Sequence, residues 1–262
     1  MKILLVYAHP EPASLNGSLQ HHIRRRLESR GHTVQVSDLY AMNWKACLDH
    51  ADFPTREAGK RLNLTGESKH AFESGTQPAD VAAEQAKLLW ADALLLQFPL
   101  WWFSMPAILK GWVDRVYAYG LAYGVGAHSD RRWGDRYGEG SFQGKRAMLV
   151  VTAGGWESHY AERGVNGPIE DLLFPINHGI LYYPGFDVMP PFVTYRVDRA
   201  DAETYAKITA ALDARLDGLS TDAPIAYRMQ NGGDYEIPSM LLRPGLESPG
   251  QTGLRLHTRI QS

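Results

Sequence analysis

The chain has 262 residues, of which 44% are hydrophobic, and a formal net charge of −2. Such a chain can bury a substantial core, either as one large α/β domain with an appendage or as two small domains. Because the charge is close to balanced, nothing in the composition indicates nucleic acid or an anionic membrane as a partner.

The single cysteine, Cys47, cannot form an intramolecular disulfide or supply a cysteine-rich metal site. The N-terminal segment lacks the basic, apolar and small-residue order of a signal peptide. No apolar run reaches the roughly 20 residues that a membrane helix needs, so no membrane span is predicted. A reducing cytoplasm is therefore the expected location.

Short apolar runs alternate with amphipathic segments from the start of the chain. Residues 2–9 form an apolar run that predicts a buried parallel strand, and residues 15–31 predict a helix that ends at Gly31. Residues 32–40 predict a second strand with alternating valines. The polar, irregular residues 43–78 then predict an excursion outside the core.

The alternation of strands and helices resumes after this excursion. In chain order it predicts a helix at 80–92, a strand at 93–102, a helix at 105–120, a strand at 145–155, a helix at 169–181, a strand at 186–195 and a helix at 200–219. Pro175 is expected to kink or break the helix in which it lies. The pattern predicts an α/β fold with a doubly wound, five-stranded parallel sheet and helices on both faces.

The character of the sequence changes after Leu219. Residues 1–220 are expected to form a single α/β domain. Residues 221–262 are rich in proline, glycine and polar side chains and show no strong period. They predict an irregular C-terminal extension that packs on the domain or on a partner subunit.

Ligands of an open parallel sheet bind beyond the carboxyl ends of its strands, and the first of these ends carries Ser14 and Asn16. Both lie where a predicted strand turns into a helix. Their side chains and the free amides of the helix N-terminus can cradle a phosphate, or the segment can be an ordinary helix cap. The segment has neither glycine-rich loop typical of a dinucleotide Rossmann site or a P-loop.

Two further strand ends carry unusual residues. Pro99 is followed by Trp101, Trp102 and Phe103, whose flat faces suit a flat heterocycle, although an aromatic trio can equally form a core or dimer patch. Thr152 is followed by glycines at 154 and 155, which let backbone amides approach a ligand, although two glycines can also form a simple turn. Together these ends predict a flat, anionic cofactor on the sheet edge.

Other chemistries find less support. The histidines are too scattered to suggest a zinc site, and no Gly-x-Ser-x-Gly elbow is present for acyl transfer.

The segments SLN, SDLYAMN, QFPLWWFSMPAILKGWVDRV, TAGG and GILYYPGF occur in this order along the chain. In these segments the sequence resembles the NAD(P)H:quinone oxidoreductases, the DT-diaphorase family, from about residue 3 to about residue 220. The resemblance implies a flavodoxin-like homodimer that binds FAD, with FMN the less favoured flavin. It also implies two-electron, ping-pong hydride transfer from NADH or NADPH to a quinone, with the active site near the dimer interface.

The resemblance also implies which residues form the site. For the pyrophosphate and the ribityl chain of the flavin these are His9, Ser14, Leu15 and Asn16, and Asn63 of the partner chain approaches the adenosine part. For the isoalloxazine they are Pro99, Leu100, Trp101, Trp102, Phe103, Thr152, Ala153, Gly154, Gly155 and Tyr160. For the nicotinamide and quinone they are Trp102, Phe103, Tyr123, His159 and Tyr183. For the catalytic role, stabilising the reduced flavin, they are Tyr160, Asn166, Gly154 and Gly155.

The chain departs from the best-known branch of that family at several positions. Asn166 stands where that branch has a histidine, Val125 replaces a cavity tyrosine and Tyr205 replaces an arginine on the adenine side. The loop at 126–140 is longer than in the family and is expected to reshape substrate access. Of the metal site of a sister branch only His178 is kept, so no metal is predicted.

Two other functions remain open at this point. An azo- or nitro-reductase would use the same hydride chemistry on the same fold. A flavin-binding ancillary subunit of a membrane transporter would share the fold without turnover. A one-electron flavodoxin carrier is disfavoured, because such carriers typically have acidic surfaces.

Overall fold

The computed structural model describes residues 1–259 and is built around one parallel sheet. The strands follow the order β2 (Thr33–Asp38), β1 (Lys2–Tyr7), β3 (Ala93–Pro99) and β6 (Arg146–Thr152). The last position is filled by β7 (Asp187–Val188) and β8 (Phe192–Thr194), which both pair with β6 in parallel. The predicted five-stranded parallel sheet is confirmed.

The fifth strand of the sheet is interrupted, whereas the sequence predicted one strand over 186–195. Pro190 and Pro191 lie between β7 and β8. Proline has no amide hydrogen to donate to a ladder, so the pairing stops there and resumes at Phe192.

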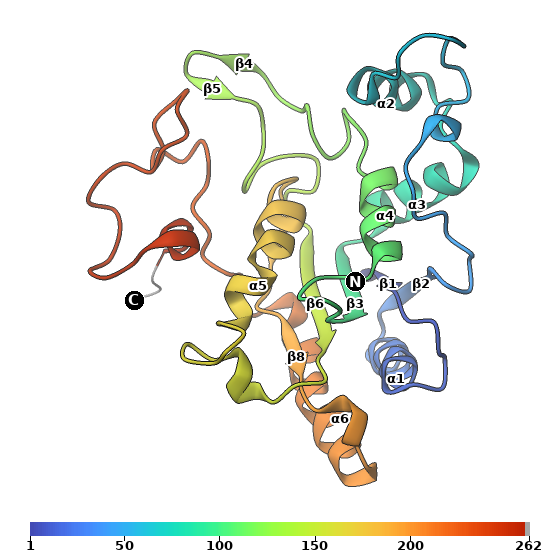
Figure 1. The fold of residues 1–262 in the computed structure, drawn as a ribbon, viewed down its shortest axis with the longest axis vertical. Coiled ribbons are helices and arrows are strands. Elements are labelled where there is room, and N and C mark those ends of the chain that lie inside the picture. Colours follow the sequence, from blue (N-terminus) through green and yellow to red (C-terminus); the bar gives the residue numbers. More distant parts are fainter. Residues whose placement is uncertain (260–262) are drawn as a thin grey trace.

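Helices cover both faces of the sheet, as the sequence predicts (Figure 1). Along β1, Ile3 and Leu5 pack with α1 (Leu15–Ser29) and α6 (Ala202–Asp217). Leu4 and Val6 belong to the opposite core, with α3 (Ala79–Trp90), α4 (Ala107–Val116) and α5 (Ile169–Ile176). Successive side chains of a strand point to opposite faces, so one apolar run serves two cores.

The structure adds a helix to the segment that the sequence treats as irregular. After a short 3₁₀ turn, η1 (His50–Asp52), helix α2 runs over Leu64–Ser74. Asn63 caps its first turn, and Gly75 ends it at φ 67°, in the left-handed region that favours glycine. Of its side chains only Ala71 is buried. The helix therefore lacks the apolar face by which a sequence pattern is recognised.

The hydrogen-bond pattern of the predicted 169–181 helix changes directly after Pro175. Helix α5 ends at Ile176, and a π-helical turn, η3 (Asn177–Tyr182), continues it. Because Pro175 cannot donate to the carbonyl four residues before it, the wider turn accommodates the missing bond. The long loop expected at 126–140 contains a small antiparallel hairpin, β4 (His128–Ser129) with β5 (Arg132–Trp133).

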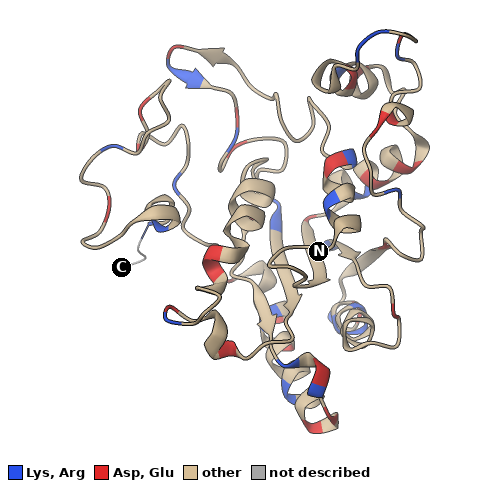
Figure 2. Cartoon of the chain, in the orientation of Figure 1, with Lys and Arg blue, Asp and Glu red and all other residues tan. Residues whose placement is uncertain are grey.

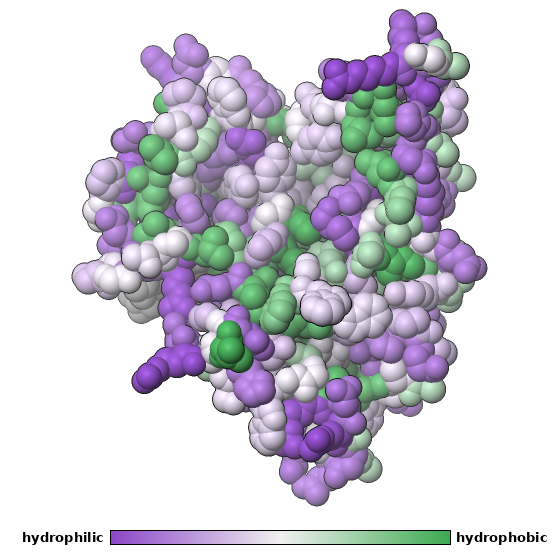
Figure 3. Space-filling model, viewed as in Figure 1, coloured by the Kyte–Doolittle hydropathy of each residue, from purple (hydrophilic) through white to green (hydrophobic). Residues whose placement is uncertain are grey.

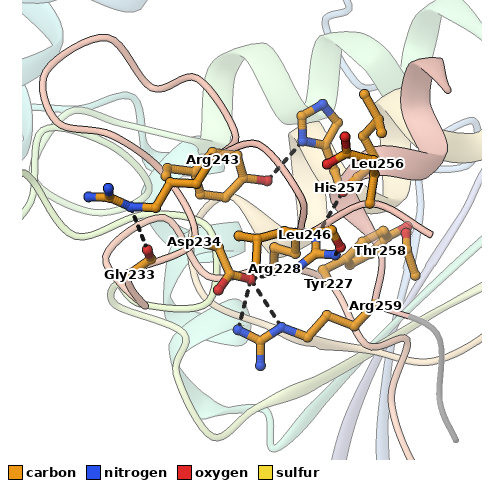
Figure 4. Close-up of polar contacts among 12 residues, drawn as sticks. Tyr227, Arg228, Gly233, Asp234, Arg243, Leu246, Leu256, His257, Thr258 and Arg259 are labelled. Atoms are coloured by element: carbon orange, nitrogen blue, oxygen red, sulfur yellow. Dashed lines mark hydrogen bonds and ion pairs between the residues drawn. The ribbon is translucent and has the colours of Figure 1, made fainter. Parts of the chain in front are cut away.

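Residues 221–259, here termed the C-terminal arm, lie against α5 and η3 and fold back on themselves (Figure 1). The Tyr227 ring packs 5.0 Å from that of His178 and 5.1 Å from that of Tyr182. Within the arm, the buried Arg228 donates to Asp234 at 2.8 Å and to the carbonyl oxygen of Leu256 at 2.9 Å (Figure 4). The arm thus has a polar centre of its own.

Acidic and basic residues alternate along the ribbon of the described chain, in keeping with its small net charge (Figure 2). Within residues 1–259, no helix combines the length and the apolar character required to cross a bilayer.

Candidate active site

The carboxyl ends of three neighbouring strands, β1, β3 and β6, meet at one edge of the sheet. Pro99 and Thr152 are partners in register, and the amide of Leu100 donates to the Thr152 carbonyl at 2.8 Å. The Ala8 amide donates to the Gln97 carbonyl at 3.0 Å. The loops that follow the three strands therefore start side by side.

A buried polar network ties these loops together. The Asn16 side chain donates to Thr152 Oγ1 at 2.8 Å, and the Gln97 side chain donates to the Asn16 carbonyl at 2.7 Å. All three residues are at most 4% exposed. Buried polar groups that bond one another hold a single arrangement, so the strand ends form a rigid platform.

Ser14 acts as a helix cap, one of the two possibilities that the sequence left open. Its Oγ accepts a hydrogen bond from the Gly17 amide at 3.2 Å and lies 3.0 Å from His9 Nδ1. A Cβ at Gly17 would lie 1.9 Å from the Pro12 carbonyl oxygen, so the loop folds onto the helix start only because this residue is glycine. Binding of a phosphate at this helix end stays a prediction.

The loop after β3 displays its aromatic side chains to solvent. The Trp102 side chain is 94% exposed and that of Phe103 is 48% exposed. Both residues have positive φ, 49° and 62°, a backbone conformation that costs about 1–3 kcal/mol for each non-glycine residue. Hydrophobic residues gather near the centre of the face in Figure 3. The loop is therefore a strained aromatic shelf and contributes no core packing at Trp102.

The backbone after β6 leaves hydrogen-bond donors unused. The Ala153 amide donates to the Thr194 carbonyl at 2.8 Å. By contrast, the amides of Gly154, Gly155, Trp102 and Phe103 donate to no other residue within 1–259. Unpaired amides are common at ligand sites, because a ligand can accept from them.

The loop after the two glycines carries the predicted catalytic pair. A Cβ at Gly155 would lie 3.1 Å from Tyr160 Cε2, so glycine lets the tyrosine ring rest on the backbone. On its other side Tyr160 packs against Tyr195, with ring centroids 5.6 Å apart. The Asn166 amide donates to the His159 carbonyl at 3.0 Å, which closes the loop.

The structure brings most of the predicted site residues to the sheet edge. These residues lie at the strand ends, in the loops that follow them, or in the loop over 156–167. They are His9, Ser14, Leu15, Asn16, Pro99, Leu100, Trp101, Trp102, Phe103, Thr152, Ala153, Gly154, Gly155, His159, Tyr160 and Asn166. His9 and Trp101 have ring centroids 6.0 Å apart. Pro99 and Ala153 are buried and present only backbone atoms.

Three predicted residues make their contacts elsewhere in the chain. Asn63 is the exposed cap of α2 and accepts from the Gly66 amide at 3.2 Å. Tyr123 packs edge-on against Tyr119 at 5.3 Å, and Tyr183 packs edge-on against Tyr137 at 5.0 Å. A single chain thus does not bring these side chains into contact with the aromatic shelf among the contacts described.

Two residues that border the glycines were not among the predicted site residues. The Arg196 guanidinium lies 3.8 Å from the ring centroid of Trp156, and the Arg196 amide donates to the Gly155 carbonyl at 3.1 Å. Arg196 has a positive φ of 56°, a strained conformation for a residue with a side chain. The available signal was position, because each residue lies within four residues of a strand end, Thr152 of β6 or Thr194 of β8.

No group of three histidine, cysteine or acidic side chains is arranged to hold a metal ion in the described part of the chain. His178 stacks instead between Phe174 at 4.6 Å and Tyr137 at 4.7 Å. Burial, together with the nearby His257, lowers the pKa of His178 to about 4. The neutral imidazole therefore serves as a packed aromatic ring above that pH.

Comparisons with known proteins agree with this geometry. A family model described as the flavodoxin-like fold matches residues 1–216. A ribosyldihydronicotinamide dehydrogenase-like protein of Penicillium crustosum is 53% identical over 261 residues, which cover 100% of this chain and 97% of the relative. The human ribosyldihydronicotinamide dehydrogenase (quinone) is 39% identical over 225 residues, which cover 86% of this chain and 94% of the relative.

A solved structure from Klebsiella pneumoniae, provisionally assigned as a quinone reductase, is 63% identical with a TM-score of 0.95. The match covers 98% of this chain and 99% of that chain. An NAD(P)H:quinone oxidoreductase from Methanothermobacter marburgensis is 25% identical with a TM-score of 0.62, over 85% of this chain and 98% of that one. The chain belongs to the flavodoxin-like family of quinone and ribosyldihydronicotinamide dehydrogenases.

Proposed function

We propose that the chain is a flavin-dependent oxidoreductase of the cytoplasm that transfers two electrons from a reduced nicotinamide to a quinone. The observation that carries this proposal is the aromatic shelf at Trp102 and Phe103, which is held in a strained conformation beside unpaired backbone amides. Strain of this kind persists where the surroundings enforce it, and it clusters at ligand sites. The relatives named as quinone dehydrogenases support the substrate class.

The residues present fit a flavin. An isoalloxazine is flat and gains negative charge on reduction, which calls for aromatic faces and hydrogen-bond donors. The shelf supplies the faces, and the amides of Gly154 and Gly155 supply donors that no other described residue uses. A bound flavin would supply the hydride chemistry that none of the side chains can provide. The C-terminal arm and the 43–78 excursion, both beyond the needs of a small flavin pocket, support FAD over FMN.

The chain's own residues would orient the reactants and stabilise charge. Trp102 and Phe103 would hold a flat substrate parallel to the cofactor and keep water from the reacting atoms. The Tyr160 hydroxyl and the side-chain amide of Asn166 would donate hydrogen bonds to the reduced cofactor. Because an amide does not act as an acid near neutral pH, Asn166 would stabilise charge without delivering a proton. The nicotinamide and the quinone would bind in turn at the same place on the aromatic shelf. The first product would therefore leave before the quinone binds, which is a ping-pong scheme.

A homodimer would complete the site. Asn63, Tyr123 and Tyr183 make their described contacts away from the aromatic shelf, yet the family resemblance implies a role for each in the site. A second copy could bring all three to the shelf of its partner. The 94% exposure of Trp102 in one chain is consistent with a surface that a ligand and a second subunit cover together.

The test is steady-state turnover by the purified, flavin-loaded protein. We expect menadione-dependent oxidation of NADH, NADPH or dihydronicotinamide riboside, with a ranking of the three that identifies the donor. Trp102→Ala should lower kcat/KM by about tenfold or more, whereas Leu89→Ala, at an exposed apolar position on α3, should not. Bound flavin without turnover of any donor would contradict the proposal and would point to a binding subunit.

A further inference from the structure

Apart from the aromatic shelf, a cavity of about 580 Å³ lies between the 156–167 loop, α5, the edge of the sheet at β8 and the C-terminal arm, and it is termed here the second cavity. Its floor is apolar and aromatic, with Phe174 from α5, Val193 from β8, and Tyr195 and Tyr227. The volume falls within the range of about 300–1,000 Å³ that is usual for small-molecule sites. Tyr195 lines this cavity and its ring contacts that of Tyr160, but Tyr160 and the aromatic shelf do not line it, so the space is distinct from the shelf.

The rim of the cavity has an excess of negative charge. Four carboxylates line it, those of Glu157, Glu162, Glu170 and Asp171. Arg255 forms an ion pair with Glu162 and lies 3.8 Å from Asp171, so it compensates those two. Glu170 and Asp171 lie in the first turn of α5, where the ribbon of Figure 2 is coloured red for acidic residues.

Two of these carboxylates form no ion pair with a cation in the described chain. Glu157 and Glu170 form no ion pair within residues 1–259. The other arginine at the rim, Arg259, pairs with Asp234 at 2.9 Å (Figure 4). Both carboxylates also lie near Tyr195, where burial and then their negative charge raise the pKa of the phenol to about 12. A cation in the cavity would thus meet two carboxylates that no ion pair occupies, of which Glu170 also feels the charge of Arg255.

Asn177 provides an independent sign of a ligand. It lines the cavity, is only 2% exposed, and its Oδ1 has no hydrogen-bond partner in the described chain. An unpaired buried acceptor destabilises the folded chain, and a hydrogen-bond donor from a ligand would remove that cost. A dry apolar contact at this position would leave that cost in place.

We propose that this cavity binds a small molecule that combines a flat or bulky apolar body with an ammonium group. The apolar floor would take the body, Glu157 and Glu170 would attract the charge, and Asn177 Oδ1 would accept from an N–H group. The inference does not depend on the proposed redox function. It concerns a different face of the 156–167 loop and a different kind of ligand.

The test uses three probes that share an indole ring and differ in charge: tryptamine, tryptophol and indole-3-propionate. Calorimetry on the purified full-length protein, with the flavin that it carries, should give tryptamine a dissociation constant of about millimolar or tighter. Indole-3-propionate should bind about tenfold more weakly, because its charge repels the two free carboxylates. Equal affinity for the cationic and anionic probes, or no binding of tryptamine, would overturn the proposal.

Variants locate the bound probe. The double variant Glu157→Gln with Glu170→Gln should reduce the preference for tryptamine to about twofold, whereas Glu203→Gln, at an exposed site on α6, should leave it unchanged. Asn177→Leu, of similar volume, should weaken all three probes, and its thermal midpoint verifies folding. Tryptamine binding lost in Trp102→Ala and kept in the double variant would place the probe on the aromatic shelf and refute the second site.

Discussion

Acid should weaken the packing of the C-terminal arm through His178. The imidazole lies between the Phe174 and Tyr137 rings, and its Nε2 is buried with no hydrogen-bond partner in the described chain. Burial, and then the charge of His257, lowers the pKa of His178 from 6.5 to about 4. The folded state therefore favours the neutral ring, and protonation opposes folding.

The sign and size of this effect follow from the pKa of His178 in the two states. Above pH 6.5 both states hold a neutral ring and the full stability is present. Between pH 6.5 and about 4 the unfolded chain binds a proton that the folded chain resists, so stability falls with falling pH. The gap between the two pKa values corresponds to about 3 kcal/mol in the free energy of unfolding.

Urea unfolding followed by circular dichroism at pH 7.5, 5.5 and 4.5 measures this loss. His178→Phe keeps a ring in the stack and removes the titrating group, so between pH 7.5 and 4.5 it should lose about 2.5 kcal/mol less than the parent, most of the full gap. His70→Phe, at an exposed position on α2, serves as the control and should follow the parent. Parallel pH curves for the parent and His178→Phe would refute the reasoning.

Three further predictions concern single side chains. Tyr160→Phe should slow flavin reduction by the nicotinamide, seen in stopped-flow absorbance, while flavin content stays near normal; unchanged reduction kinetics would remove the role of the hydroxyl. Trp102→Gly relieves a positive φ at an exposed site, so the free energy of unfolding of the flavin-free protein should stay the same or rise by at most about 1 kcal/mol. The thermal midpoint measures this and should not fall. Arg228→Met should cost about 2–5 kcal/mol, because the carbonyls of Leu246 and Leu256 lose their buried donor at about 1–3 kcal/mol each, while Arg259 still pairs with Asp234. Hydrogen exchange should rise in the arm, and unchanged exchange there would contradict this.

The sequence was sufficient for the sheet and its strand ends because these depend on local patterns. Runs such as Leu94–Leu96 are apolar at every position, which is what a strand buried on both faces requires. The convergence of Asn16, Thr152 and the glycines also followed, since parallel strands place their carboxyl ends together. The residue roles assigned by family resemblance remain predictions.

Features that depend on tertiary packing were beyond the sequence. Helix α2 buries almost nothing, so its pattern was weak. The positive φ of Trp102 and Phe103 has no signature in residue type, because these residues disfavour that conformation. The stacking of Arg196 on Trp156 joins segments 40 residues apart in the numbering, and the second cavity needs the arm to fold against α5.

The central claim is that a flavin ring lies against Trp102, Phe103 and the backbone of Gly154 and Gly155. Titrating flavin-free protein with FAD and with FMN, and following the quenching of flavin fluorescence, tests it directly. We expect one flavin to bind per chain, with FAD bound more tightly, and Gly155→Val, whose Cβ would crowd Tyr160, to weaken binding at least tenfold. No binding of either flavin, or equal binding by Gly155→Val, would contradict the account.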